Sequence, residues 1–328
     1  MKCIAMFSGG LDSSIAIHLI KKQGIEIIAL HFVLPFYSKL GFSFEKIKIA
    51  AKELDVPLKI IEEDEEYLEM FKNCEYGFGK NINPCLDCRI HRLIKAKKIM
   101  EEIGASFIIT GEVVGQRPMS QRRDCLDIID KKTGLKGYIL RPLCAKILKP
   151  TVPEERGWIN REELLDFWGR GRKNQIEYAT KNNIKYPSPA GGCILTQKRT
   201  SERYKDLVEH NKNFTLNDFK LLAYGRHFRI SHKLKMIQSR NEKENYIISK
   251  LILPQDIVLS MQNILGPIAI LRGEADIVEI KKACEIFAKY TKERNKLSAS
   301  IEITNINKEK KVIMVKPALE QECEKYRI

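Results

Sequence analysis

The stretch F-S-G-G-L-D-S-S, residues Phe7 to Ser14, constrains the fold of this 328-residue chain more than any other feature. It follows a short apolar run, Met1 to Met6, and it precedes apolar residues at helical spacing: Ile15, Ile17, Leu19 and Ile20. A strand, a tight loop and a helix are therefore predicted. Gly9 and Gly10 permit close backbone approaches, and Asp12 and the neighbouring serines are expected to cap the helix. Because free N–H groups at a helix N-terminus bind anions, the loop predicts a phosphate site rather than an ordinary glycine turn.

Further apolar segments extend this pattern into a sheet. The predicted strands are 25–33, 58–61, 106–110 and 138–143. Helical periodicity is found at 44–54, 90–103, 161–169 and 174–183. The near-continuous apolar character of 25–33 is typical of a strand buried in a parallel sheet. Repeated strand–helix units predict an α/β fold with a doubly wound parallel sheet, and a nucleotide then lies outside the carboxyl ends of its strands.

The character of the chain changes after about Phe214. Before that point, the acidic run 62–69 is interpreted as the solvated start of a helix. After it, a helix is predicted at 277–290, and alternating segments occur at 227–236, 246–251, 268–272, 300–304 and 312–315. These segments predict a smaller α+β domain. We therefore predict two domains, at residues 1–200 and 214–328.

The net charge of +15 is spread along the chain, with +7 from Ser201 onward and +8 before it. This balance suits a polyanionic partner such as RNA, although a lysine-rich surface that only aids solubility gives the same count. No apolar run reaches membrane-spanning length, and the first apolar residues lead into the phosphate loop rather than forming a signal peptide. We therefore expect a cytoplasmic protein with no membrane partner. The sequence leaves the oligomeric state open, a homodimer included.

Three of the nine cysteines form a pattern that metal sites use. Cys85 and Cys88 make a C-x-x-C pair, and Cys193 follows Gly191–Gly192. Such a pair serves as a redox dithiol, as half of a zinc site, or as two ligands of an iron–sulfur cluster. A four-cysteine zinc site needs a second close pair, which the sequence lacks, so zinc is the weaker alternative. Three thiolates leave one iron of a 4Fe–4S cluster open for an exogenous sulfide. The remaining alternative, three unrelated thiols, is less favoured because Pro84 and the two glycines shape tight loops.

The octet at residues 7–14 resembles the pyrophosphate loop of the N-type ATP pyrophosphatases, the PP-loop family. This resemblance implies cleavage of ATP between its α- and β-phosphates and transfer of AMP to the substrate. It assigns phosphate binding to the residues that match the loop: Ser8, Gly9, Gly10, Asp12 and Ser13. Phe7 and, in the second predicted strand, Phe32 complete this side of the expected nucleotide site. Mg²⁺ is expected beside the phosphates, with Asp12 as its holder.

The stretch T-G-E-V-V-G-Q-R-P-M-S-Q, residues 110–121, resembles a signature of the tRNA 4-thiouridine synthetases, and R-P-L at 141–143 resembles another part of their pattern. Related tRNA 2-thiouridylases share the three-cysteine arrangement. The match spans about residues 1–200. It implies that Thr110, Gly111 and Gln116 line the nucleotide pocket and that Ser120 and Gln121 complete the motif. It also implies that a 4Fe–4S cluster is held by three thiolates: Cys85, Cys88 and Cys193.

Two departures from that family are expected. The PP-loop begins near residue 8, without the usual N-terminal RNA-binding portion, and no C-terminal rhodanese domain is evident. A cluster-borne or free sulfide is therefore the favoured source of sulfur. The C-terminal segment instead resembles a small RNA-binding module of tRNA-linked proteins.

The sequence thus predicts an ATP-dependent tRNA sulfurtransferase whose catalytic set is Asp12, Cys85 and Cys193. A uridine carbonyl would be adenylated, and sulfur would replace its oxygen as AMP leaves. The expected partners are tRNA and a sulfur donor, either free sulfide or a cysteine desulfurase system. Candidates for contacts with the RNA backbone are Arg117, Arg122, Arg123, Arg170, Arg172 and Lys173. The alternatives are an amide-forming ligase of the same superfamily, which needs no cysteines, and a non-catalytic RNA- or zinc-binding protein.

Overall fold

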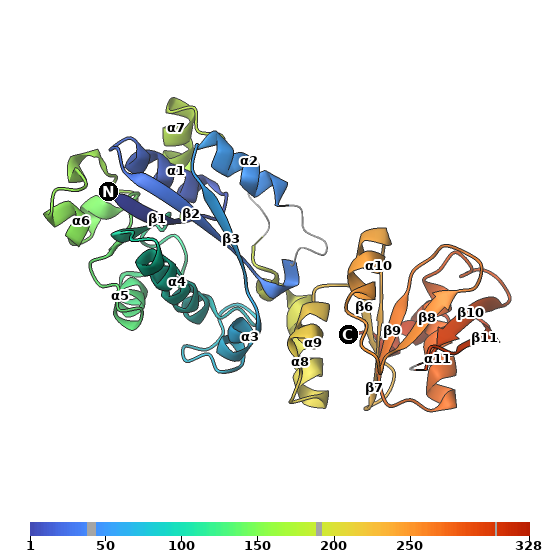
Figure 1. The fold of residues 1–328 in the computed structure, drawn as a ribbon. Coiled ribbons are helices and arrows are strands. Elements are labelled where there is room, and N and C mark those ends of the chain that lie inside the picture. Colours follow the sequence, from blue (N-terminus) through green and yellow to red (C-terminus); the bar gives the residue numbers. More distant parts are fainter. Residues whose placement is uncertain (38–43, 188–191, 306) are drawn as a thin grey trace. The chain divides into compact units, whose positions relative to one another are not determined.

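The computed structural model describes residues 1–37, 44–187, 192–305 and 307–328 (Figure 1). The chain forms two compact units, which we describe one at a time. The first unit comprises the described residues within 1–34 and 43–193, and the second comprises those within 35–42 and 194–328. Residues 194–200, which we predicted to end the first domain, lie in the second unit. So do residues 201–213, which we had left between the two predicted domains.

The first unit is built on a five-stranded parallel sheet with the order β3-β2-β1-β4-β5. Its strands are β1 (Lys2–Met6), β2 (Glu26–Val33), β3 (Leu58–Glu62), β4 (Phe107–Thr110) and β5 (Ile139–Leu140). Strand β1 lies at the centre, and Cys3 is paired with both Ile27 and Phe107. The chain moves outward through β2 and β3 and then returns to the other side of β1 for β4. This topology confirms the predicted doubly wound fold, and it places the switch point between β1 and β4.

Helices cover both faces of this sheet (Figure 1). Helices α1 (Leu11–Lys21) and α2 (Glu45–Glu53) pack on one face, where α7 (Lys173–Lys181) covers α1. Helices α4 (Cys85–Glu102) and α5 (Arg123–Lys132) pack on the other, and α3 (Glu65–Lys72) lies against α4. Because side chains alternate along a strand, Cys3 and Ala5 face the first group, whereas Ile4 and Met6 face the second. Near-continuous apolar strands are required because both faces are buried.

Short helices complete the first unit: α6 (Val152–Glu155), η2 (Ala145–Ile147) and η3 (Arg161–Glu163). The predicted helix at 161–169 is therefore wrong beyond its first turn. The prediction for α4 was also wrong at its start, because the helix begins at Cys85 rather than at residue 90. This difference puts Cys85 and Cys88 on the first turn of a helix. No helix within the described ranges is both long and apolar enough to cross a membrane.

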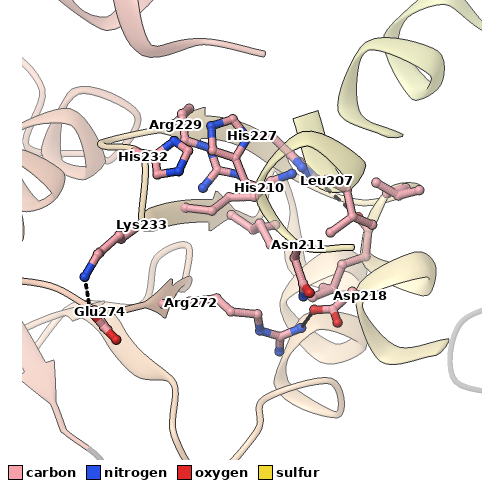
Figure 2. A pocket seen from close by; sticks show the side chains of 15 residues that line it. Leu207, His210, Asn211, Asp218, His227, Arg229, His232, Lys233, Arg272 and Glu274 are labelled. Carbon is pink, nitrogen blue, oxygen red and sulfur yellow. Dashed lines mark hydrogen bonds and ion pairs between the residues drawn. The ribbon is translucent and has the colours of Figure 1, made fainter. Parts of the chain in front are cut away.

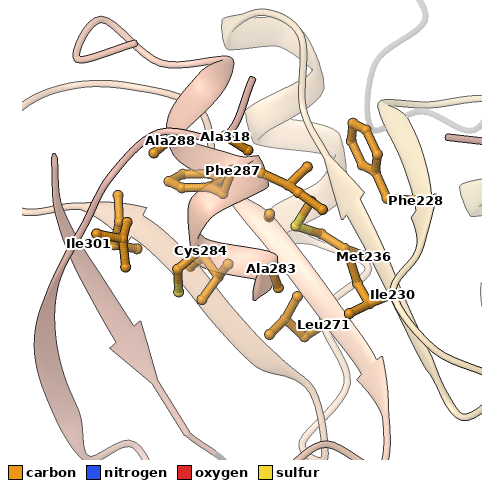
Figure 3. Packing of buried hydrophobic residues seen from close by; sticks show 14 of the residues in the cluster. Phe228, Ile230, Met236, Leu271, Ala283, Cys284, Phe287, Ala288, Ile301 and Ala318 are labelled. Atoms are coloured by element: carbon orange, nitrogen blue, oxygen red, sulfur yellow. The ribbon is translucent and has the colours of Figure 1, made fainter. Parts of the chain in front are cut away.

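The second unit contains a six-stranded antiparallel sheet with the order β11-β10-β8-β9-β7-β6. Its strands are β6 (Arg226–Arg229), β7 (Leu234–Gln238), β8 (Ile257–Met261), β9 (Ala269–Gly273), β10 (Ala299–Thr304) and β11 (Lys310–Val315). Helix α11 (Ile277–Lys289) lies on one face of the sheet, and Figure 3 shows Ala283, Cys284 and Phe287 of this helix beside Met236 and Leu271 of the strands. The antiparallel sheet with separate helices confirms the predicted α+β class.

The remaining helices of this unit are η1 (Pro35–Tyr37), η4 (Ile194–Thr196), α8 (Lys198–His210), α9 (Leu216–Leu221), α10 (Glu242–Ser249) and α12 (Glu320–Tyr326). Two local predictions were wrong here. The single alternating segment 227–236 is a hairpin of β6 and β7. The segment 246–251 begins inside α10, which starts after Asn241 because the Asn241 side chain accepts a hydrogen bond from the Glu244 amide.

Candidate active site

The loop between β1 and α1 leaves the start of the helix open. Gly9 has a φ of 74°, a conformation that favours glycine, and Gly10 is the extended N-cap residue of α1. The Ser13 and Ser14 hydroxyls donate to the Gly10 carbonyl at 2.9 and 3.1 Å. The N-cap residue, Gly10, has no side chain with which to cap the helix, and its own amide donates to the Ser8 hydroxyl at 3.4 Å. The expected capping of the helix amides by Asp12 and the serines is therefore wrong, because the Ser13 and Ser14 hydroxyls bind the Gly10 carbonyl instead. Uncapped amides at a helix start are a site for an anion.

The stretch 110–121 meets this loop at the carboxyl edge of the sheet. Gly111 follows β4, and a β-carbon on it would lie 2.5 Å from the Ser13 amide nitrogen. Only glycine therefore permits this approach. The Gln116 amide group donates to Asp12 Oδ2 at 3.2 Å. Two motifs separated by about a hundred residues in sequence thus form one site, because β1 and β4 are neighbours.

Asp12 is the least compensated carboxylate of this site. Burial raises its pKa, whereas the hydrogen bond from Gln116 and the charges of Arg172 and Arg117 act in the opposite direction. Its second oxygen, Oδ1, is buried and has no hydrogen-bond partner among the described residues. An orphaned carboxylate oxygen beside an anion site fits a divalent cation that bridges to phosphate oxygens.

The start of the 110–121 stretch is fixed by a buried carboxylate that sequence reasoning missed. Glu112 is fully buried; it accepts a hydrogen bond from the Thr110 hydroxyl at 3.0 Å and pairs with Arg141 at 3.0 Å and Arg89 at 3.1 Å. Burial alone would raise the pKa of Glu112, but the charges of the two arginines keep it below its ordinary value. Arg141 in turn donates to Asp130. Thr110, predicted to line the nucleotide pocket, has its hydroxyl engaged in this network.

The rest of the 110–121 stretch folds back on itself. The Gly115 amide donates to the Gln121 carbonyl at 2.7 Å, and the Gln121 amide donates to the Arg117 carbonyl at 3.1 Å. Ser120 and Gln121 are both buried. These two residues therefore hold the shape of the loop that presents Gln116 and Arg117.

The two predicted aromatic residues lie in the core under the loop. Phe7 is buried among residues of the α1 face, and Phe32 is buried on the α4 face with the Arg92 guanidinium 5.8 Å from its ring centroid. The Phe7 amide donates to the Leu30 carbonyl, and the Phe7 carbonyl accepts from His31 Nδ1 at 2.9 Å. Phe7 thus anchors the start of the loop, whereas Phe32 packs in the core of the α4 face.

Cys85 and Cys88 lie on the first turn of α4, after Pro84 as N-cap. The Tyr67 hydroxyl donates to Cys88 Sγ at 3.8 Å. Burial raises the pKa of Tyr67, and the charges of Cys88 and Cys193 raise it further, so both cysteines lie within electrostatic range of this phenol. The described residues contain no group of three His, Cys, Asp or Glu side chains placed to hold a metal ion. The predicted turn before Cys193 falls largely on residues 188–191, outside the described residues.

Arg117 acts electrostatically on both the cysteine pair and the phosphate loop. Burial raises the pKa of Cys85, while the charges of Arg117 and Arg89 lower it. Arg117 therefore lies within electrostatic range of both Asp12 and Cys85. Of the other predicted RNA contacts, Arg122 is paired with Asp124, Arg123 donates to the Ile147 carbonyl, and Lys173 is paired with Glu177.

A second buried carboxylate, Glu63, is related to Cys88 through Arg92, whose charge acts on both. Glu63, part of the run interpreted as solvated, is buried instead, and that interpretation was wrong at this residue. It pairs with His91 at 3.0 Å, Arg92 at 3.1 Å and Lys95 at 3.2 Å. Burial opposes ionisation of Glu63, but the hydrogen bond with His91 and the three neighbouring charges lower its pKa. The charge of Arg92 is also felt by Cys88 and Tyr67, so this cluster supports the cysteine helix.

Two family models match parts of this chain. Residues 1–152 match the tRNA methyl transferase HUP domain, and residues 225–327 match the NFACT protein RNA binding domain. A probable tRNA sulfurtransferase of Lysinibacillus sphaericus (strain C3-41) is 35% identical over 147 residues, which cover 43% of this chain and 34% of that protein. A probable tRNA sulfurtransferase of Methanobrevibacter smithii is 31% identical over 173 residues, which cover 50% of this chain and 43% of that protein.

Among solved structures, a 4-thiouridine synthetase–RNA complex with bound ATP has a TM-score of 0.39 and 23% identity, and the match covers 60% of this chain and 45% of that one. This similarity is too low to bear on function. The chain spans less than half the length of the two curated relatives named above. The parallel sheet and the loop at its carboxyl edge agree with the first family model: residues 1–152 are similar to the tRNA methyl transferase HUP domain, and residues 225–327 are similar to the NFACT protein RNA binding domain.

Proposed function

We propose that this protein is an ATP-dependent tRNA thiolase that adenylates a uridine carbonyl and replaces its oxygen with sulfur. The observation that carries the proposal is the position of the 110–121 stretch. Its Gln116 contacts Asp12 of the phosphate loop, and its Arg117 lies within electrostatic range of both Asp12 and Cys85. An ATP-splitting site and a pair of thiols would therefore serve the same substrate.

In the first step, the loop would hold ATP for attack on its α-phosphate. The open amides at the start of α1 would bind the pyrophosphate oxygens. Asp12 would hold Mg²⁺ through its unpartnered Oδ1, and the cation would neutralise charge as pyrophosphate leaves. The charge of Arg117 would stabilise the same oxygens. The uridine oxygen forms a bond to the α-phosphorus, the bond to pyrophosphate breaks, and the carbonyl oxygen becomes part of an AMP leaving group.

In the second step, a sulfide would attack the activated carbon and AMP would leave. Cys85, Cys88 and Cys193 are the residues that would hold a 4Fe–4S cluster, because thiolates are the donors such clusters use. When bound, the cluster would supply sulfide at an iron without a protein ligand. Tyr67 would orient Cys88 through its hydroxyl. Arg89 and Arg117 favour the thiolate form of Cys85.

tRNA is the proposed substrate. The match of residues 225–327 to an RNA-binding domain and the positive charge of the chain support this choice. The target base would have to be unpaired or flipped to reach a site at the edge of a sheet. We also propose a cytoplasmic location, where tRNA is available as a substrate.

The test is anaerobic reconstitution with unmodified tRNA, ATP, Mg²⁺ and sulfide. We expect pyrophosphate release that depends on tRNA, and one thiolated nucleoside by mass spectrometry. Cys85→Ser, Cys88→Ser and Cys193→Ser should each remove both the thiolated nucleoside and the brown absorbance of the cluster. Cys74→Ser is the matched control, because Cys74 is half-buried like the three but lies outside the C-x-x-C pair.

Each contrary outcome points to a defined alternative. If the triple cysteine variant is fully active, the cysteines are not part of the chemistry, and an amide-forming ligase is favoured. If wild-type protein is colourless, fully active and binds stoichiometric zinc, the cluster is excluded. If ATP is not split in the presence of tRNA, the enzymatic proposal fails.

A further inference from the structure

A pocket of about 420 Å³ opens in the second unit between the strands β6, β7 and β9 and the helices α8 and α9 (Figure 2). His227, Arg229 and Lys235 come from the sheet that matches the RNA-binding family, whereas His210 and Asp218 come from the helices that precede the matched residues. Its volume is at the low end for small-molecule sites, so it admits a nucleotide-sized group rather than a duplex. The lining residues all belong to the second unit, whereas the residues assigned above to ATP and the three cysteines belong to the first.

At the end of the pocket formed by Arg229 and Lys235, the buried positive charge exceeds the negative charge of Asp206, the carboxylate that pairs with both. Asp206 accepts from Arg229 at 2.8 Å and from Lys235 at 2.7 Å. Behind them lies Arg203, which is buried and donates only to the Leu222 and Gly225 carbonyls among the described residues. Two cations therefore share the carboxylate of Asp206, and the charge of Arg203 acts on Lys235 from nearby.

The electrostatics of this end support the same view. Burial and the charges of Arg229 and Arg203 lower the pKa of Lys235 to about 8, despite its pairing with Asp206. Burial and neighbouring arginines lower the pKa of Arg203 to about 10. An anion bound here would remove an unfavourable charge balance rather than create one.

His227, which lines the pocket, offers a nitrogen that is unpartnered among the described residues and to which a ligand could donate a hydrogen bond. His227 is buried, and its Nε2 lies 2.8 Å from the Tyr224 carbonyl and 3.2 Å from the Leu221 carbonyl, so Nε2 is the protonated nitrogen. Its Nδ1 has no partner in the part of the chain that the structure describes. At the other end, Arg272 is shared by Asp218 and Asp256, so carboxylates outnumber cations there. The pocket therefore has one end suited to phosphate and one that is not.

We propose that this pocket binds a nucleotide of single-stranded RNA, with the phosphate against Arg229, Lys235 and His232. His232 and Lys233 lie exposed in the turn between β6 and β7, at the mouth of the pocket. The choice of RNA rests on the proposed function and on the family match of the sheet. The pocket would hold the substrate RNA independently of the chemistry in the first unit.

The test is fluorescence anisotropy with the full chain and a short labelled single-stranded RNA, over a series of salt concentrations and without ATP. Lys235→Met should weaken binding roughly tenfold or more, because a hydrogen bond to a charged group is lost. The slope of log affinity against log salt should fall by about 1. Lys233→Met removes an exposed cation that is paired with Glu274, and it should shift affinity in the same direction by a smaller factor. Lys311→Met, an exposed lysine on β11, is the matched control and should bind as wild type does.

A gain of binding would be harder to explain by misfolding. Asp206→Asn frees Arg229 and Lys235 from their shared carboxylate and should strengthen RNA binding several-fold. Uridine monophosphate should compete with the RNA, and uridine should not. If Lys235→Met and Lys233→Met keep the wild-type affinity and salt slope, the pocket is not an RNA site. Competition by inorganic phosphate as strong as that by the nucleotide would overturn the nucleotide assignment. Asp12→Asn should bind RNA normally, so failure of the thiolation proposal would leave this result untouched.

Discussion

Asp12 in the first unit and Lys235 in the second are both ionisable side chains whose charged form is disfavoured by burial. The pKa of Asp12 is raised, and that of Lys235 is lowered to about 8. Asp12 has an oxygen without a partner within the described residues and lies beside open helix amides. Lys235 shares its carboxylate partner, Asp206, with Arg229. Burial of a charged side chain thus makes the first site suitable for a cation that accompanies phosphate, and it makes the second site suitable for phosphate itself.

The largest expected effect comes from removing the charge of Asp12. Asp12→Asn should lower the rate of tRNA-dependent pyrophosphate release by about a thousandfold, because a metal-holding carboxylate supplies several kcal/mol of transition-state stabilisation. Its melting temperature should stay equal or rise slightly, since the lost charge was disfavoured by burial. Asp127→Asn, at an exposed position of α5, is the control. Near-wild-type pyrophosphate release by Asp12→Asn would remove Asp12 from the mechanism.

The second prediction sharpens the contrast between Asp12 and the compensated carboxylate Glu112. Glu112→Gln should lower the free energy of unfolding by about 3 kcal/mol, because Arg89 and Arg141 lose their shared buried partner. The pKa of Glu112 is lowered in the folded protein, so its contribution is present above its ordinary pKa and is lost as pH falls through the lowered value. Denaturant unfolding of Glu112→Gln and wild type should therefore converge in acid. Glu101→Gln, on the exposed side of α4, should unfold as wild type does at every pH.

The third prediction concerns the junction of the two motifs. Gly111→Ala should place a methyl group 2.5 Å from the Ser13 amide nitrogen and push the stretch 110–121 away from α1. We expect a loss of about 2 kcal/mol in stability and a larger loss in ATP binding, measured by calorimetry. Gly171→Ala is the control, because a β-carbon there meets nothing within 4 Å in the described structure and its φ is not positive. Equal ATP affinity in the two variants would contradict the packing of Gly111 against the loop.

The parts of the fold that the sequence predicted are those with a local signal. The strand–loop–helix around residues 7–14 and the buried strands could be read from spacing alone, and the neighbouring positions of β1 and β4 follow from the doubly wound topology. The start of α4 was missed because Asn83, Pro84 and the cysteines look like a loop, whereas Pro84 serves as the N-cap.

Burial of charge could not be predicted, because it depends on partners that are distant in sequence. Glu63 stands in an acidic run that looks solvated, and it is buried because Arg92 and Lys95 of α4 cover it. Glu112 lies inside a motif that was noticed, yet its role depends on Arg141 after β5. The pocket of the second unit requires Asp206 of α8 beside Arg229 of β6, and no spacing in the sequence reports that contact.

The smallest effect tests whether Lys235 is retained at a cost to stability. At neutral pH its side chain is protonated in both the folded and the unfolded protein, and the folded state carries the unfavourable charge. Between about 8 and the ordinary value of 10.5, the folded protein loses this proton while the unfolded chain keeps it, so wild-type stability should rise with pH relative to Lys235→Met. We expect Lys235→Met to be more stable at neutral pH by on the order of 1 kcal/mol, because loss of the Asp206 ion pair offsets part of the relief. Melting curves should show this difference closing as pH rises, whereas Lys311→Met should follow wild type throughout. A variant that is less stable at neutral pH, with a gap that widens in base, would mean that Lys235 is a structural ion-pair residue and that the comparison with Asp12 does not hold.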